Sequence, residues 1–182
     1  MNKILLILIF TLIQLIVPAQ KYITKNGYIS FFGSTPLENI KAENNQVASI
    51  LDAANGDLVF QGLIKSFHFE KKLMEEHFNE NFVDSDKYPR FQFKGKILNI
   101  SEVNFSKSGT HNADVRGEMT INNITRQIEA KGTLELLENA VVGKSKFNIR
   151  PEDYNIKIPG VLREKVAKEM EVTVDARYSP MN

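Results

Sequence analysis

Histidine, cysteine and carboxylate side chains are the residues from which a metal or nucleophilic site is most often built, and this chain arranges few of them suitably. It contains three histidines, His68, His77 and His111, and no cysteine. The best metal-binding fragment is His77 with Glu80, which a helix would place about one turn apart. Such two-residue fragments are common on acidic helices and fall short of a metal site. We therefore expect neither a bound metal nor a cofactor.

Catalytic groups are equally hard to find. Catalysis would need a nucleophile beside a base, a carboxylate pair in a cleft, or a metal cluster. No spacing in the sequence indicates any of these, so we expect a binding protein and not an enzyme. An enzyme that depends on His77 is the less favoured alternative.

Basic residues are the remaining candidates for ligand recognition, as partners of an anionic head group. Lysines around an acidic helix are more often solvated and pair with glutamates four residues away, so a surface position is the default interpretation. His77 borders an apolar helix face, and we interpret it, with Arg90, as a polar residue at the rim of a binding site. The candidate cations are Lys71, Lys72, Lys87 and Arg90.

A short amphipathic helix is predicted at residues 71–82, between these basic residues. Its apolar side chains recur at helical spacing, while glutamates and an asparagine cover the opposite side. Asp84 and Asp86 end the pattern, and Pro89 favours an extended backbone before the next strand. The apolar residues are Leu73, Met74, Phe78 and Phe82. A helix with one apolar face is suited to cover the end of a barrel as a lid.

Alternation of apolar and polar residues dominates the rest of the chain and predicts antiparallel strands with one buried face. Residues 124–136 show it most clearly. The pairs Asn55-Gly56 and Asn122-Asn123 predict tight turns, because asparagine and glycine tolerate positive φ. A short helix is also expected at residues 161–168. The other predicted strands cover residues 28–32, 40–51, 58–69, 91–97, 113–121, 141–149 and 170–178.

About eight long antiparallel strands form either a sandwich or a closed up-and-down barrel, and a barrel of this size can hold one small ligand. Glycines within the strands suit strongly curved barrel strands, although a bent sandwich would use them too. If they face inward, a hollow centre is expected. These glycines are Gly62, Gly95, Gly117, Gly132 and Gly143.

Phenylalanines supply enough aromatic surface either to line a hydrophobic tunnel or to fill a solid core, and filling is the default for any single residue. The candidates for the tunnel and its lid are Phe60, Phe67, Leu73, Phe78, Phe82, Phe91, Phe93, Val115 and Met119.

The N-terminal sequence predicts a cleaved signal peptide, residues 1–19. Lys3 precedes an apolar stretch that ends at Val17-Pro18-Ala19, with small residues where a signal peptidase reads. The stretch has about fourteen residues, against roughly twenty needed to span a membrane, which disfavours an uncleaved anchor. The lack of cysteine excludes a lipidated-cysteine anchor and disulfides. We expect a periplasmic or secreted protein, with residues 20–182 as a single domain.

The charge balance disfavours nucleic-acid binding. With Lys3 removed, 22 of the 23 basic residues remain against 22 acidic ones, and no basic cluster stands out. Membrane contact is expected to be transient at most. The oligomeric state stays open, a homodimer included.

Two segments resemble the YceI-like family of small secreted lipid- and isoprenoid-binding proteins. In the first, a helix with a His-aromatic pair leads through an aspartate-rich turn to Tyr-Pro and a phenylalanine strand. The second, residues 117–126, resembles the hairpin of that family, although Asn123 stands where glycine is usual. A second departure lies in the Arg-x-Asp-aromatic motif of the family, which has an extra residue here between Arg150 and Asp153. The matches in the first segment are His77, Phe78, Phe82, Asp84, Tyr88, Pro89 and Phe93.

This resemblance implies an all-β fold: an eight-stranded, antiparallel, up-and-down, lipocalin-like barrel with one short lid helix. It also implies a long-chain lipid or isoprenoid as the partner, such as a polyisoprenoid or fatty-acid derivative, held inside the barrel for storage or transport. A stress-response or protein-interaction module with a filled core and no lipid cargo is the alternative.

Overall fold

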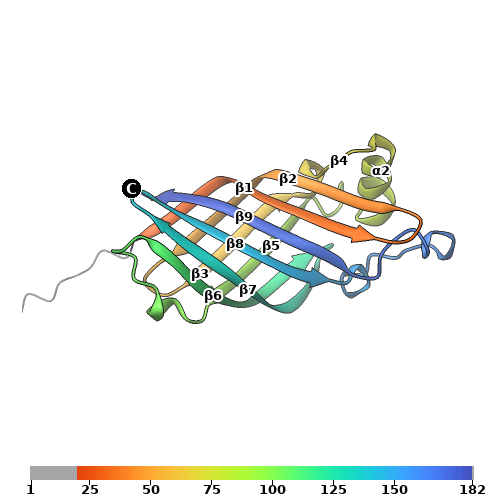
Figure 1. Ribbon diagram of the computed structural model, residues 1–182. Helices are drawn as coiled ribbons and strands as arrows, with labels where there is room; N and C mark the ends of the chain where they lie inside the picture. Colours follow the sequence, from red (N-terminus) through yellow and green to blue (C-terminus); the bar gives the residue numbers. More distant parts are fainter. Residues whose placement is uncertain (1–19, 182) are drawn as a thin grey trace, which may run out of the picture.

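The computed structural model describes residues 20–181, and most of them lie in long antiparallel strands (Figure 1). The predicted signal peptide therefore lies outside the described residues. The long strands are β1 (Lys21–Ser34), β2 (Asn39–Asp52), β3 (Asp57–Leu63), β5 (Arg90–Ile97), β6 (Gly109–Ile121), β7 (Ile124–Leu137), β8 (Ala140–Ile149) and β9 (Met170–Pro180).

These strands close into a barrel. Each pairs with its neighbour in chain order, from β1 to β9, and β9 pairs in turn with β1. All of these pairings are antiparallel, so the predicted eight-stranded up-and-down barrel is confirmed. Closure gives every long strand a paired neighbour on each side, so no long strand lies at an open edge of the sheet.

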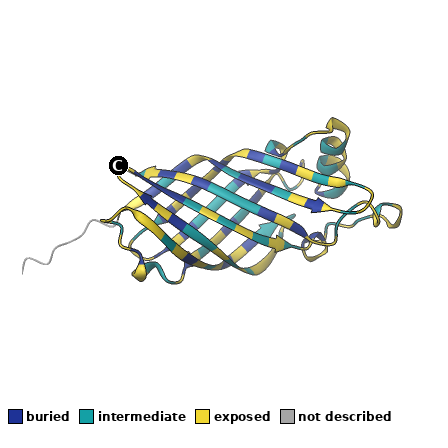
Figure 2. Cartoon of the chain, viewed as in Figure 1, coloured by how far each residue is buried: buried dark blue, intermediate teal, exposed yellow. Residues whose placement is uncertain are grey.

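Burial alternates along the strands, as the sequence pattern predicts (Figure 2). In β7, Leu134 and Leu136 are 4% and 3% exposed, whereas Glu135 between them is exposed. Successive side chains of a strand point to opposite faces, so one face fills the interior and the other meets solvent. The apolar core therefore lies inside the barrel.

The predicted hairpin turns are confirmed. Gly56, between β2 and β3, has φ of 78°. Asn122 and Asn123, between β6 and β7, have φ of 51° and 58°. Two positive φ angles in succession match the twist of the flanking strands. Asparagine tolerates this conformation, so Asn123 serves where glycine would be usual.

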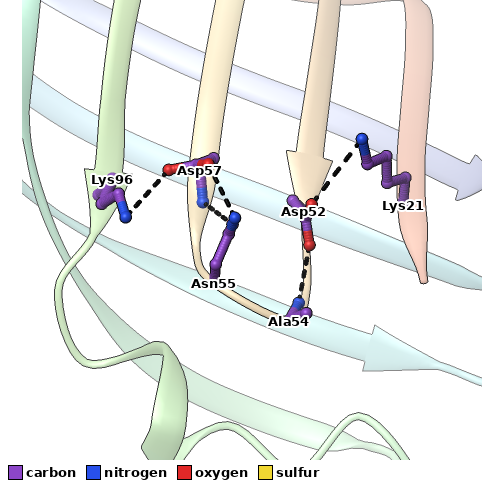
Figure 3. Close-up of polar contacts among 6 residues, drawn as sticks. All are labelled: Lys21, Asp52, Ala54, Asn55, Asp57 and Lys96. Atoms are coloured by element: carbon purple, nitrogen blue, oxygen red, sulfur yellow. Dashed lines mark hydrogen bonds and ion pairs between the residues drawn. The ribbon is translucent and has the colours of Figure 1, made fainter. Parts of the chain in front are cut away.

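Polar side chains hold the β2–β3 turn at one end of the barrel (Figure 3). The Asn55 Oδ1 atom accepts a hydrogen bond from the backbone N–H of Asp57 at 2.8 Å. Two ion pairs join this hairpin to the strands beside it: Lys21 with Asp52 at 3.9 Å and Lys96 with Asp57 at 3.2 Å. All of these groups lie near the surface, where ion pairs contribute little to the free energy of folding. We therefore expect them to fix the geometry of the turn and to add little to the stability of the protein.

The strand predicted at residues 58–69 is interrupted. A 3₁₀ turn, η1 (Ile64–Ser66), follows β3, and the chain then forms the two-residue strand β4 (His68–Phe69), which pairs with β2. Ile64 and Phe67 are both buried although they are three residues apart, which a continuous strand would not allow.

The predicted lid helix is present as α2 (Lys72–His77), followed by a wider turn of π type, η2 (Phe78–Phe82). The helix expected at residues 161–168 is not formed. Only the short 3₁₀ turn η5 (Gly160–Leu162) lies there. Val161 is 87% exposed, so it gains no packing that would stabilise a helix. No helix within residues 20–181 is both long and apolar enough to cross a membrane.

Candidate functional site

An apolar cavity of about 230 Å³ lies inside the barrel. All eight long strands contribute inner-face residues to its wall. The lid adds Met74, Phe78 and Phe82, and the connection between β8 and β9 adds Ile156 and Ile158. The cavity therefore extends toward the end of the barrel that carries α2.

The wall of this cavity is suited to hydrocarbon and unsuited to charge. Lys144 is the single charged residue among the described residues that line it, and its ammonium pairs with Asp175 at 3.6 Å on the outer face. An ion placed among apolar walls without a partner would be strongly destabilised. The volume of the cavity is slightly below the roughly 300–1,000 Å³ typical of small-molecule sites. A cavity of this size fits a slender chain better than a bulky ring system.

The inner surface holds one buried polar pair that the sequence did not single out, Ser49 and Tyr178. The Ser49 hydroxyl donates to the Val59 carbonyl at 2.7 Å, so the Tyr178 hydroxyl must donate to Ser49 Oγ, 2.8 Å away. Burial raises the pKa of Tyr178. Both hydroxyl protons are thus used internally, and the pair gives a ligand no free donor.

Glycines do face the interior, but aromatic rings occupy the space they leave. Gly95 and Gly117 oppose each other across β5 and β6. A Cβ atom on either would lie within 2.7 Å of Cζ of Phe93. Gly62 accommodates the Phe91 ring in the same way. The expectation that inward glycines produce the hollow is therefore wrong at these three positions, where their missing side chains make room for phenylalanine rings.

A cluster of phenylalanines holds the lid on the barrel. The Phe78 ring centroid lies 5.5 Å from that of Phe31 in β1, 5.1 Å from that of Phe69 in β4, and 6.2 Å from that of Phe67. Such tilted and edge-on contacts are favourable beyond the area they bury. The lid is therefore fastened above β1 and β2.

Polar contacts support this position of the lid. The Glu75 carboxylate accepts a hydrogen bond from the backbone N–H of Phe69 at 3.0 Å. The Lys71 ammonium lies 2.7 Å from Oε1 of Glu38, in the turn between β1 and β2. This pair lowers the pKa of Glu38 and raises that of Lys71.

Most of the predicted lining residues surround the cavity. Leu73 is the exception: it is 62% exposed and does not line the wall. Met74 and Phe78, four residues apart, set the inward face of α2, and Leu73 lies about 100° around the helix from Met74. Ligand contact by any of them stays a prediction. Those that line the cavity are Phe60, Phe67, Phe78, Phe82, Phe91, Phe93, Val115 and Met119.

The predicted rim residues do not face the cavity. His77 is exposed, and its side chain makes no hydrogen bond within the described part of the chain. Arg90 is exposed beside the inward-facing Phe91 and therefore points outward. No group of three or more metal-ligating side chains lies among residues 20–181.

The predicted cations of the lid also lie on the surface. Lys71 and Lys72 are exposed on the lid, the first in its ion pair with Glu38. The Lys87 ammonium lies 5.1 Å from the centroid of the Tyr88 ring. None of these lysines lines the cavity.

Comparison with known proteins identifies relatives of this barrel. The model of one protein family, described as YceI-like domain, matches residues 24–178. No curated protein matches the chain.

Solved structures share the fold at low sequence identity. A polyisoprenoid binding domain from Saccharophagus degradans has a TM-score of 0.75 at 10% identity, covering 90% of this chain and 99% of that domain. BcnA from Burkholderia cenocepacia has a TM-score of 0.70 at 14% identity, covering 84% and 96%. The YceI protein of Campylobacter jejuni has a TM-score of 0.62 at 14% identity, covering 79% and 86%.

Proposed function

This chain belongs to the YceI-like family, and we propose that it binds one long-chain amphiphile, a polyisoprenoid or fatty-acid derivative, inside the barrel for storage or transport. The observation that carries the proposal is the apolar cavity beneath the lid, whose only charged lining residue within the described chain directs its ammonium to the outer face. A protein of similar fold is described as a polyisoprenoid binding domain, which supports the same class of ligand.

Hydrocarbon burial alone can supply the affinity. Each methylene moved from water into the cavity contributes about 0.8 kcal/mol, partly offset by the lost freedom of the chain. The interior hydroxyls of Ser49 and Tyr178 are already paired, so they do not select a polar group. We therefore propose that the cavity selects for tail length and bulk, with no chemical change to the ligand.

The lid is proposed to control access to this cavity. Met74, Phe78 and Phe82 project from it into the cavity wall. Moving the lid would expose the cavity at that end of the barrel. An extracytoplasmic location is proposed on the predicted signal peptide, and it suits a carrier that collects lipid outside the cytoplasm.

Native mass spectrometry tests the proposal. The protein is purified from its own host without detergent, any released molecule is extracted and identified, and the emptied protein is offered palmitate and farnesol. One equivalent of a long-chain species is expected. A clean unliganded mass that also refuses both probes would contradict lipid binding and favour a protein-interaction module.

A matched pair of variants locates the binding site. Ala130 lines the cavity from β7, whereas its neighbour Lys131 is exposed on the outer face. Ala130→Phe fills the cavity and is expected to abolish uptake. Lys131→Phe is expected to retain it. Equal uptake by the two folded variants would show that the ligand lies elsewhere.

A further inference from the structure

The barrel wall is incomplete between β7 and β8. Their pairing ends at Gly132 opposite Ser145, although β7 continues back to Ile124 and β8 continues to Ile149. At this last pair, the Ser145 hydroxyl donates a hydrogen bond to the Lys131 carbonyl at 2.8 Å. Residues 124–131 and 146–149 thus lie beyond the ladder, at the end of the barrel that carries the lid (Figure 1).

A short segment after β8 lies over this opening. The 3₁₀ turn η4 (Pro151–Tyr154) follows β8 directly and contacts β7. Tyr154 is 2% exposed and packs into the apolar core. The Asn122 Nδ2 atom, in the β6–β7 turn, donates to the Tyr154 carbonyl at 3.3 Å. The turn therefore bridges the two strands where their own hydrogen bonds stop.

Arg126 lies on the inner face of β7 at this opening. It stands opposite Met119, which is 9% exposed and lines the cavity, and directly opposed residues share a face of the sheet. Yet Arg126 is exposed. Along the same face, exposure rises from buried Leu134 through half-buried Ile128 to Arg126. Ile124, two residues nearer the turn, is half-buried, so Arg126 is the one exposed side chain on this face of β7. It lies at the end of the barrel where the β7–β8 ladder has stopped, which we call the mouth.

The Arg126 guanidinium is available to a ligand. It forms no ion pair within residues 20–181, and its one side-chain hydrogen bond there is a long one, 3.4 Å from Nη1 to the Thr125 carbonyl. Tyr154 is its close neighbour. Burial and the Asp153 carboxylate raise the pKa of Tyr154, and the positive charge of Arg126 opposes that rise. Arg126 is thus a cation without an ion-pair partner among the described residues. The neighbouring η4 carries two exposed carboxylates, Glu152 and Asp153, of which Glu152 pairs with Arg150.

We propose that Arg126 binds the anionic head group, a carboxylate or phosphate, of the amphiphile whose tail fills the cavity. This inference rests on the proposed function and adds the class of head group. The planar guanidinium offers parallel N–H donors that match either anion. Its position at the mouth leaves the head group hydrated while the tail is buried, so no charge has to enter the apolar interior.

The test compares probes with matched tails and different heads: palmitate with hexadecanol, and farnesyl diphosphate with farnesol. Binding is measured by calorimetry for the wild type, Arg126→Gln, Arg126→Lys and Arg177→Gln. Arg177 is the control, an exposed arginine between the inward-facing Ala176 and Tyr178 of β9 and thus on the outer face. The pair of probes that shows a charge preference identifies the anion as carboxylate or phosphate.

The wild type is expected to bind an anionic probe at least about tenfold more tightly than its neutral partner. Arg126→Gln loses this preference without weakening the neutral probe. Arg126→Lys, which keeps the charge but loses the parallel donors, retains only part of it, and Arg177→Gln is unchanged. Asp153→Asn, which removes the repelling carboxylate, strengthens binding of the anion.

Three results overturn the inference, and the third also overturns the proposed function. If Arg126→Gln binds every probe as the wild type does, or if the wild type shows no preference for an anion, the head-group assignment fails and the lipid cavity stands. If the wild type binds no probe at all, the proposed function fails and the head-group assignment fails with it.

Discussion

The ring of Phe78 in the lid lies 5.5 Å from the ring of Phe31 in β1. This contact and its neighbours fasten the lid on one side of the barrel mouth. The unpaired stretch of β7 and β8 lies elsewhere on the wall, two strands beyond β1 in the order of the sheet. Exchange of the proposed ligand would therefore have to displace η4 from the gap between β7 and β8 or part the aromatic cluster.

Truncation of Phe78 is expected to loosen the lid. Removing a fully buried phenylalanine ring costs roughly 3–5 kcal/mol, and Phe78 is half-buried, so Phe78→Ala should lower the free energy of unfolding by about 2 kcal/mol. Hydrogen exchange of residues 68–82 should also become faster. Leu73→Ala, in the same helix but exposed, should change stability by less than about 0.5 kcal/mol. Equal losses in the two variants would argue against the aromatic anchor.

Charges placed on the inner face of the lid should impair its control of the cavity. The double variant Phe78→Asp, Phe82→Asp places two carboxylates where apolar side chains line the wall. We expect weaker lipid uptake in a titration with palmitate, because the lid can no longer pack over the tail. Undiminished affinity in a double variant that still folds would refute the gating role.

Glycine is required at position 117 because the backbone of β5 and the Phe93 ring approach it too closely for a side chain. A Cβ atom there would lie 2.4 Å from the Lys94 carbonyl oxygen and 2.7 Å from Cζ of Phe93. We expect Gly117→Ala to cost about 1–3 kcal/mol in urea unfolding, since backbone and ring must both shift. Gly160→Ala is the control, because its Cβ would meet nothing within 4 Å. A loss at position 160 as large as that at 117 would contradict this explanation.

Removing the hydroxyl of Ser49 and removing that of Tyr178 should lower the stability of the protein by different amounts. Ser49→Ala leaves the buried Tyr178 O–H without an acceptor and should cost about 1–3 kcal/mol. Tyr178→Phe leaves Ser49 still donating to the Val59 carbonyl and should cost about 1 kcal/mol. Thermal unfolding of both variants checks the order, and a larger loss for Tyr178→Phe would reverse the assigned direction of the bond.

Stability should fall at alkaline pH. Burial raises the pKa of Tyr178 above its ordinary value of 10.0, so above about pH 10 the unfolded chain loses a proton that the folded protein keeps. The free energy of unfolding should therefore decrease as pH rises, by up to about 1.4 kcal/mol per pH unit from this tyrosine. Burial shifts Tyr22 and Tyr154 in the same direction. Tyr178→Phe should show a shallower decrease in denaturant titrations, and an identical slope would contradict the assignment.

Much of the architecture followed from local pattern. Alternation along β7 and the asparagine pair at 122 and 123 specify which face is buried and where the chain reverses, because both depend on side-chain direction and local φ. The same pattern already placed Arg126 in phase with Ile124 and Ile128. A charged residue in the apolar phase of a strand is the signal that could have drawn attention to it earlier.

The sequence by itself thus determined most of the strands, the lid helix and the apolar inner face, since these rest on contacts within a few residues. It did not determine the break after Leu63. Only the tertiary structure decided that Phe93 covers Gly95 and Gly117, that Leu73 faces solvent, and that β7 and β8 part beyond Gly132. Those features depend on which strands meet and how their rings share one enclosed volume. Packing inside the barrel is decided by residues that are far apart in the chain, so the local alternation of apolar and polar residues does not predict it.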